Sequence, residues 1–106
     1  MVVYHLTAAN VFEQCRQDTA NYKKIVLMLS GNGCQPCQNI MPRVTQLSTQ
    51  YPDILFLKAL SHEVPELFGG HGIPMFKLFK SGKLWYNFTG ADNGKLTEAV
   101  KKLSQL

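Results

Sequence analysis

The sequence predicts an α/β fold in which a mixed five-stranded sheet is flanked by four helices, in the order βαβαβαββα. A continuous apolar run over residues 25–29 is typical of a strand that is buried on both faces of a sheet. Helical patterns follow each of the first three expected strands, whereas the last two strands adjoin each other. The length of 106 residues and the 45% hydrophobic content are those of one domain, which we expect to span residues 1–106.

The first half of the chain alternates strands with helices. β-Branched and aromatic residues predict a strand over residues 2–6, and Thr7 is a candidate N-cap for a helix that extends to about Ala20. Residues 25–29 predict the central strand of the sheet. Three- and four-residue spacing marks one inward stripe of the first helix, formed by Val11, Phe12, Cys15 and Thr19.

The helix after the central strand covers residues 34–50, where the apolar positions keep helical spacing. Pro42 lies inside this helix, and an interior proline removes one backbone hydrogen bond and bends the axis. We therefore expect a kink near residues 38–41 rather than a break. Residues 53–60 then predict another buried strand, and residues 63–68 predict a short helix.

A hairpin and a helix are expected to complete the fold. Residues 75–79 and 83–88 predict two strands joined by a tight turn, in which Gly82 supplies the positive φ. Residues 95–106 predict the final helix, and its inward positions are Leu96, Val100 and Leu103.

Hydropathy and charge argue against membranes and nucleic acids as partners. The longest apolar run is far shorter than the roughly 20 residues of a membrane span. The first residues lack the features of a secretory signal, so we expect a cytoplasmic protein. The net charge of +4 comes from lysines scattered along the chain, and most aromatic residues fall at positions expected to be internal. Single-stranded nucleic acid would instead require exposed aromatics along a basic groove.

The segment Cys34-Gln35-Pro36-Cys37 lies where the central strand meets a helix. Cysteines at positions i and i+3 place both sulfurs on one face of the first turn, close enough to bond. The positive end of the helix dipole stabilises a thiolate at Cys34, and a thiolate is the attacking species in disulfide exchange. Pro36 suits this turn because its missing N–H would have had no partner. These residues predict a redox-active pair.

Zinc is the alternative ligand of such a pair, but a structural zinc site needs about four ligands. The histidines His5, His62 and His71 are scattered singly, and Cys15 lies on the expected core stripe. We therefore predict no metal site. A small apolar core residue is our interpretation of Cys15, in preference to a regulatory thiol, because free cysteines are commonly buried.

Several features together resemble the thioredoxin family over nearly the whole chain. They are the apolar strand before Cys34, the helix with the internal proline, the Gly72-Ile73-Pro74 turn, residues 76–83, and Gly90-Ala91 before the last helix. The resemblance implies that the bond before Pro74 is cis and that a substrate peptide pairs with the backbone of Ile73. It further implies substrate contacts at Gly33, Gln35, Pro36 and Gly90.

The resemblance also implies the activity and the partners. We expect a monomeric thiol-disulfide oxidoreductase that reduces protein disulfides, with the Cys34–Cys37 disulfide as its redox centre and no bound cofactor. Cys34 attacks the substrate disulfide, and Cys37 resolves the mixed disulfide. A flavin-dependent thioredoxin reductase is the electron donor that the family suggests.

Three departures from the family pattern stand near the cysteine pair. Gly33 replaces the usual tryptophan before the first cysteine, and Gln35 replaces the usual glycine after it. Met28 occupies the position of the buried aspartate that relays a proton, so Lys58 lacks the carboxylate that usually pairs with it. Gly31 and Gly33 give the approach loop flexibility. A non-catalytic module that binds a client in the groove beside Pro74 therefore remains an alternative function.

Overall fold

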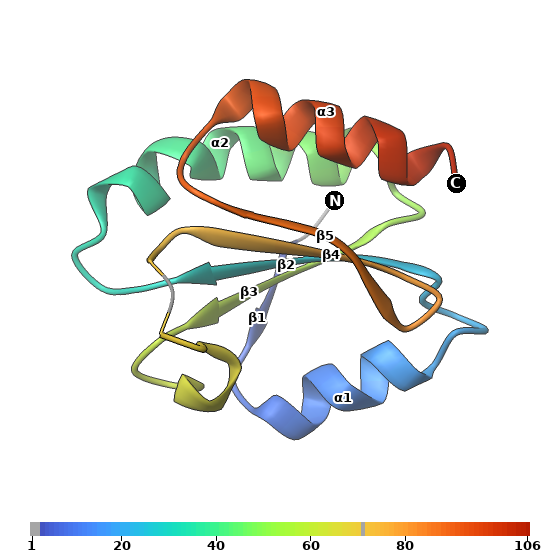
Figure 1. The fold of residues 1–106 in the computed structure, drawn as a ribbon, viewed down its shortest axis with the longest axis horizontal. Coiled ribbons are helices and arrows are strands. Elements are labelled where there is room, and N and C mark those ends of the chain that lie inside the picture. The colour runs from blue at the N-terminus through green and yellow to red at the C-terminus, as the bar shows by residue number, and fades with distance from the viewer. Residues whose placement is uncertain (1–2, 71) are drawn as a thin grey trace.

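Five strands, three α-helices and one short 3-10 helix make up the fold of the computed structural model, which describes residues 3–70 and 72–106 (Figure 1). Val2, which the sequence places in the first strand, and His71 lie outside the described residues. The elements are β1 (Val3–Leu6), α1 (Ala9–Gln17), β2 (Lys24–Ser30), α2 (Gln35–Gln50), β3 (Leu55–Leu60), η1 (Pro65–Leu67), β4 (Met75–Lys80), β5 (Lys83–Thr89) and α3 (Asn93–Ser104).

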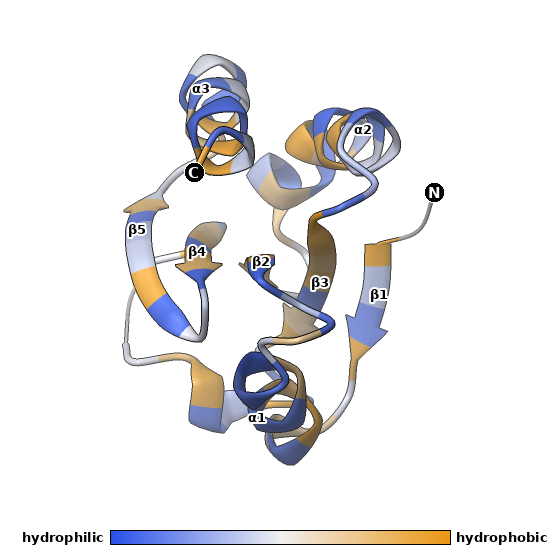
Figure 2. Cartoon of the chain, turned by 90° about the vertical axis from the view of Figure 1, so that its right-hand side faces the viewer, coloured by the Kyte–Doolittle hydropathy of each residue, from blue (hydrophilic) through white to orange (hydrophobic). Residues whose placement is uncertain are grey.

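The strands form one mixed sheet in the order β1-β3-β2-β4-β5. β3 pairs in parallel with β1 and β2, whereas β4 is antiparallel to both β2 and β5. β2 is therefore the central strand, as the sequence predicts. Figure 2 shows α2 and α3 on one face of the sheet and α1 on the other, with β5 and β1 at the two edges. The predicted mixed sheet with helices on both faces is confirmed.

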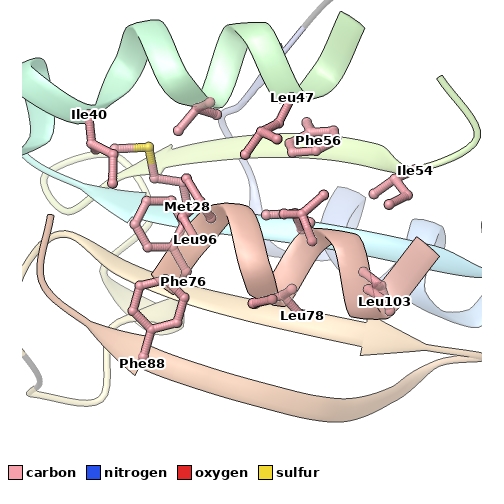
Figure 3. Close-up of a cluster of buried hydrophobic side chains, with 14 of the residues drawn as sticks. Met28, Ile40, Leu47, Ile54, Phe56, Phe76, Leu78, Phe88, Leu96 and Leu103 are labelled. Carbon is pink, nitrogen blue, oxygen red and sulfur yellow. The ribbon is translucent and has the colours of Figure 1, made fainter. Parts of the chain in front are cut away.

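Alternate residues of β2 belong to two separate hydrophobic clusters, one on each face of the sheet. Val26 and Met28 pack in the larger cluster beneath α2 and α3, where Figure 3 shows Met28 close to Ile40 of α2. The residues that alternate with these two belong to the cluster on the α1 face, and they are Ile25, Leu27 and Leu29. All five side chains are at most 1% exposed. Burial on both faces explains why this strand is an unbroken apolar run.

Both predicted ends of the first helix are wrong. The N-cap of α1 is Ala8, without a side-chain cap, instead of Thr7. The helix ends at Gln17, because the carboxylate of Asp18 accepts hydrogen bonds from the backbone and side chain of Asn21 and closes a local turn. Within the predicted stripe, Phe12 is buried and Cys15 is half-buried, whereas the other two residues, Val11 and Thr19, are exposed.

The predicted fourth helix is only the three-residue 3-10 turn Pro65–Leu67. Proline starts this turn without a backbone N–H, and Gly69 and Gly70 follow it closely, so few residues can propagate a helix. α2, by contrast, continues through Pro42 without a break, as predicted.

α3 begins two residues before the predicted start, because Asp92 accepts the Lys95 N–H at 2.9 Å and caps the helix. It also ends earlier, at Ser104, and its predicted inward residues are all buried: Leu96, Val100 and Leu103. Within residues 3–70 and 72–106, no helix is long and apolar enough to span a bilayer.

The β4–β5 turn packs against the end of α1. Ser81 and Gly82 both have positive φ, 52° and 80°, which is the pairing that a tight hairpin turn requires. The Gly82 carbonyl accepts a hydrogen bond from Arg16 Nη1 at 2.8 Å. A Cβ on Gly82 would lie 2.9 Å from the Arg16 carbonyl oxygen. Both the backbone conformation and this contact therefore require glycine.

Replacing Gly82 with Ala is expected to lower the free energy of unfolding by about 1–2 kcal/mol, because a methyl group must adopt positive φ and crowd a backbone oxygen. Gly94→Ala is the matched control, since Gly94 lies within α3 and its Cβ would make only ordinary contacts. That change should leave stability unchanged or raise it by up to about 1 kcal/mol. Urea denaturation measures both variants. Equal effects of the two changes would contradict the role assigned to the turn.

Candidate active site

Cys34 and Cys37 form a disulfide at the start of α2, with their Cα atoms 5.3 Å apart. Cys34 is the N-cap of the helix, and its Sγ accepts the Cys37 N–H at 3.2 Å. Cys34 is half-buried at the surface, whereas Cys37 is only 2% exposed. Cys34 is therefore the more accessible of the two cysteines to an incoming sulfur. The unpaired N–H groups of the first helical turn favour negative charge on the accessible sulfur.

A second segment, between η1 and β4, lies beside the disulfide end of the sheet. The Ile73–Pro74 peptide bond is cis, as the resemblance implies. The Pro74 carbonyl accepts the Gly90 N–H at 2.8 Å, which ties this turn to the end of β5. Ile73 is half-buried and, like Cys34, packs against the hydrophobic cluster under α2 and α3. The structure thus gathers Cys34, Ile73, Pro74 and Gly90 at one end of the sheet.

Gly31 joins these two segments by close packing. A Cβ on Gly31 would lie 2.7 Å from Ile73 Cδ1 and 3.2 Å from Ser61 Oγ. The sequence suggests flexibility as the reason for this glycine, but the structure shows that space is the reason. Gly33 differs, because its φ is +69° and a Cβ there would meet nothing within 4 Å. The position next to Cys34 is therefore open to solvent.

The buried Cys37 also lines a small cavity of about 180 Å³. Cys37, Lys58 and Gly33 line it together with Ser30, Gly31, Asn32, Gln38, Met41 and Leu60. None of these described lining residues carries a carboxylate. Met28 is fully buried and lies directly across from Lys58 in the β2–β3 register. The structure thus brings Lys58 to the cavity beside Cys37, and it leaves Met28 outside that cavity.

Gln35 and Pro36 are exposed on the first turn of α2, next to the accessible sulfur. The Gln35 amide donates a hydrogen bond from Nε2 to Asn39 Oδ1 at 2.8 Å. Asn39 therefore orients a side chain beside the redox pair, and it is not among the site residues that the sequence predicts. The sequence does contain an indication of this contact. Gln35 and Asn39 are spaced i, i+4 on a predicted helix, which places their two amide side chains next to each other.

Cys15 is remote from the disulfide, on the opposite face of the sheet. It is half-buried and packs against the hydrophobic cluster under α1, in agreement with a core role. Burial raises the pKa of the Cys15 thiol, and the nearby Asp18 carboxylate raises it further. Over residues 3–70 and 72–106, no group of three or more histidine, cysteine, aspartate or glutamate side chains is placed to hold a metal ion.

Comparison with known proteins agrees with this geometry. Residues 2–102 match the family model described as Thioredoxin. The chain is 32% identical over 106 residues to a thioredoxin of Geodia cydonium, with 96% of this chain and 98% of the relative covered. It is 29% identical over 89 residues to human thioredoxin, with 81% and 85% covered.

Solved structures give the same assignment. Oxidised mitochondrial thioredoxin 3 of Saccharomyces cerevisiae superposes with a TM-score of 0.87 at 28% identity, with 95% of each chain covered. Fasciola hepatica thioredoxin gives a TM-score of 0.86 at 28% identity, with 94% of this chain and 98% of that chain covered. The chain therefore belongs to the thioredoxin family, and the Cys34–Cys37 disulfide is the redox centre of a thiol-disulfide oxidoreductase.

Proposed function

We propose that this chain reduces protein disulfides, with Cys34 as the attacking residue and Cys37 as the resolving residue. The observation that carries the assignment is the difference in exposure between the two cysteine residues, since Cys34 is half-buried and Cys37 is 2% exposed. The helix N-terminus supports the same order, because it favours a thiolate at Cys34.

The proposed reaction begins with both cysteines reduced. The Cys34 thiolate attacks one sulfur of the substrate disulfide, forms a mixed disulfide and releases the other substrate sulfur as a thiolate. Cys37 then loses its proton and attacks Cys34 Sγ, which displaces the second substrate thiolate. Two electrons pass to the substrate, and the Cys34–Cys37 disulfide is left. The cavity that joins Cys37 to Lys58 is the route by which the Cys37 proton leaves.

The proposed substrate site surrounds the accessible sulfur. Substrate backbone pairs with Ile73, while Gly33, Gln35, Pro36 and Gly90 form the rim. Gly33 presents no side chain where the family usually has tryptophan, so the rim admits larger side chains beside the scissile disulfide. A flavin-dependent thioredoxin reductase is the proposed electron donor, and the disulfide itself is the proposed redox centre, with no bound cofactor.

A non-catalytic binding module is the second candidate function. The absence of a carboxylate among the described residues around Cys37 favours it, because resolution then lacks an acid-base group. Reduction of a protein disulfide with a dithiol as electron source separates the two functions. Repeated turnover supports the reductase, whereas stoichiometric binding without turnover supports the module.

Serine substitutions test the two cysteine roles. Cys34→Ser is expected to abolish exchange because it removes the accessible thiolate. Cys37→Ser should leave the first attack intact and trap the mixed disulfide with substrate. Intact-protein mass spectrometry after incubation with a protein disulfide detects the trapped adduct. An adduct in Cys34→Ser, together with none in Cys37→Ser, would mean that the roles are reversed.

Alkylation order provides an independent test of reactivity. In the reduced protein at pH 7, limiting iodoacetamide should modify Cys34 well before Cys15, because burial and Asp18 raise the pKa of the Cys15 thiol and leave less thiolate. Raising the pH to 9 should reduce the difference in alkylation rate between Cys34 and Cys15, since a larger fraction of the Cys15 thiol is then ionised. Peptide mass spectrometry assigns the modified residue. Equal rates for Cys34 and Cys15 at pH 7 would contradict the assignment of the nucleophile.

Met28→Asp tests the missing acid-base group. The new carboxylate would lie across from Lys58, so decay of the mixed disulfide at pH 7 should accelerate. The same change should lower the free energy of unfolding by about 1–3 kcal/mol, because it buries a polar group in the core. Met28→Leu is the matched control, and it keeps an apolar side chain without adding a proton acceptor.

Stopped-flow measurement of mixed-disulfide decay from about pH 6 to 9 provides the readout. The wild-type rate should rise with pH through one ionisation, that of the resolving thiol. Two ionisations in the wild type, with Met28→Asp no faster at pH 7, would show that another residue already replaces the carboxylate.

A further inference from the structure

A groove of about 360 Å³ lies between β5 and α3. β5 is an outer strand of the sheet, and Figure 2 shows α3 above it on the α2 side. Two aromatic residues of β5 and four residues of α3 line the groove, and they are Trp85, Tyr86, Lys95, Glu98, Ala99 and Lys102. Nothing in the proposed redox mechanism uses these residues.

A β-bulge directs both aromatic side chains into this groove. In the β4–β5 register, Leu78 pairs with Tyr86 and Phe79 pairs with Leu84, so Trp85 has no partner on β4. Neighbouring residues of a regular strand point to opposite faces, but the bulge lets Trp85 and Tyr86 line the same groove. Their ring centroids are 5.9 Å apart, and the residues are 38% and 40% exposed.

Charge on α3 completes the groove. Lys95, Glu98 and Lys102 recur at helical spacing along one side of α3, and all three are exposed. Among the described residues, none of the three forms an ion pair within 4.0 Å. Lys95 Nζ lies 5.8 Å from the Phe88 ring centroid, which holds one amine over β5. Two lysines against one glutamate make the groove basic.

We propose that the β5–α3 groove binds an acidic segment of a partner protein. An apolar side chain of that segment packs against Trp85 and Tyr86 over the small, buried Ala99, and its carboxylates lie at Lys95 and Lys102. Tryptophan and tyrosine in a partly enclosed hollow are the residue types that carry binding energy at protein interfaces. Opposite charge on the partner then gives orientation and fast association.

Two other occupants fit the groove less well. Single-stranded nucleic acid stacks its bases on successive exposed rings, but here the Trp85 and Tyr86 planes are inclined by 58° and the next ring, Phe88, is buried. Glu98 would also repel the phosphates. A second copy of this chain would present the same positive groove, so like charges would face each other.

The aromatic part of the groove, formed by Trp85 and Tyr86, lies at the end of the sheet away from the disulfide. Through β4, the residues next to Trp85 align with Ile25 and Val26 at the start of β2. Cys34 instead follows the end of β2 at Ser30. A segment anchored on Trp85 and Tyr86 therefore leaves the Cys34 sulfur free. Partner binding in the groove does not depend on the direction of the redox reaction. Substitutions of groove residues should therefore leave disulfide reductase turnover unchanged.

Trp85 is the only tryptophan of the chain, so its fluorescence reports on the groove directly. The probe is an acetylated peptide of about ten residues with glutamates around a central leucine, and the control peptide carries lysines in place of the glutamates. We expect the acidic peptide, but not the control peptide, to change the Trp85 fluorescence until it saturates. Its affinity should fall several-fold at about 0.5 M salt, because dissolved ions screen the charges.

Charge reversal identifies the site. Lys95→Glu and Lys102→Glu should each weaken binding of the acidic peptide by about fivefold or more. Lys23→Glu is the matched control, because it makes the same change in net charge at an exposed position outside the groove, and it should change affinity by less than about twofold. Disulfide reductase turnover of all three variants should equal that of the wild type, which confirms that they fold.

Four results would overturn the proposal. The first is the lack of any saturable fluorescence response to the acidic peptide, and the second is an equal loss of affinity in Lys23→Glu and in the groove variants. The third is tighter binding of oligothymidylate than of the peptide. The fourth is self-association, measured by sedimentation, that Lys102→Glu abolishes. The third result would assign the groove to nucleic acid, and the fourth would assign it to a second copy.

Discussion

The burial of β2 on both faces is the constraint on which the rest of the structure depends. β2 pairs with β3 on one side and with β4 on the other, so its backbone is hydrogen-bonded along both edges. Its alternate side chains join the two hydrophobic clusters, so α1 must lie on one face and α2 with α3 on the other. Displacing this strand would expose both clusters at once. The position where β2 ends is therefore fixed by pairing with two strands and by packing on both faces of the sheet.

The redox pair uses that position. Cys34 follows β2 by a few residues and caps α2, so a buried strand and a helix N-terminus together fix the position of the Cys34 sulfur. The cis-Pro74 turn reaches the same place from the start of β4, and Gly31 lets Ile73 approach within packing distance. Each segment ends there because the sheet topology brings the end of β2 beside the start of β4. The redox pair and the proposed substrate-binding segment thus share one end of the sheet.

Met28 and the bulge at Trp85 are the two unusual features of the sheet, and they have different consequences. Met28 strengthens the core beneath α2 but leaves the cavity around Cys37 with a lysine and no carboxylate among its described lining residues. The bulge at Trp85 weakens regular pairing at the β5 edge but gathers two aromatic rings beside basic residues of α3. A bulge also makes an edge strand a poorer template for pairing with other strands. The first feature bears on the proposed resolution step, whereas the second forms part of the proposed binding groove.

Local patterns in the sequence were enough to predict the strands, the three long helices and the cysteine pair, because apolar periodicity and strand-to-helix junctions involve neighbouring residues. Gly82 was identified in the same way, since a tight turn requires positive φ within a few residues. The helix predicted at residues 63–68 failed because a short segment has little periodicity to read.

Tertiary structure alone decided the features that depend on contacts between distant segments. It buried Cys37 while leaving Cys34 accessible, and it showed that Gly31 is small because Ile73 packs against it. It also placed Lys58 at the cavity of Cys37. The partners in these contacts are separated by many residues in the chain. No local pattern encodes their approach, because the sheet order and the packing of helices on its faces determine which of them meet.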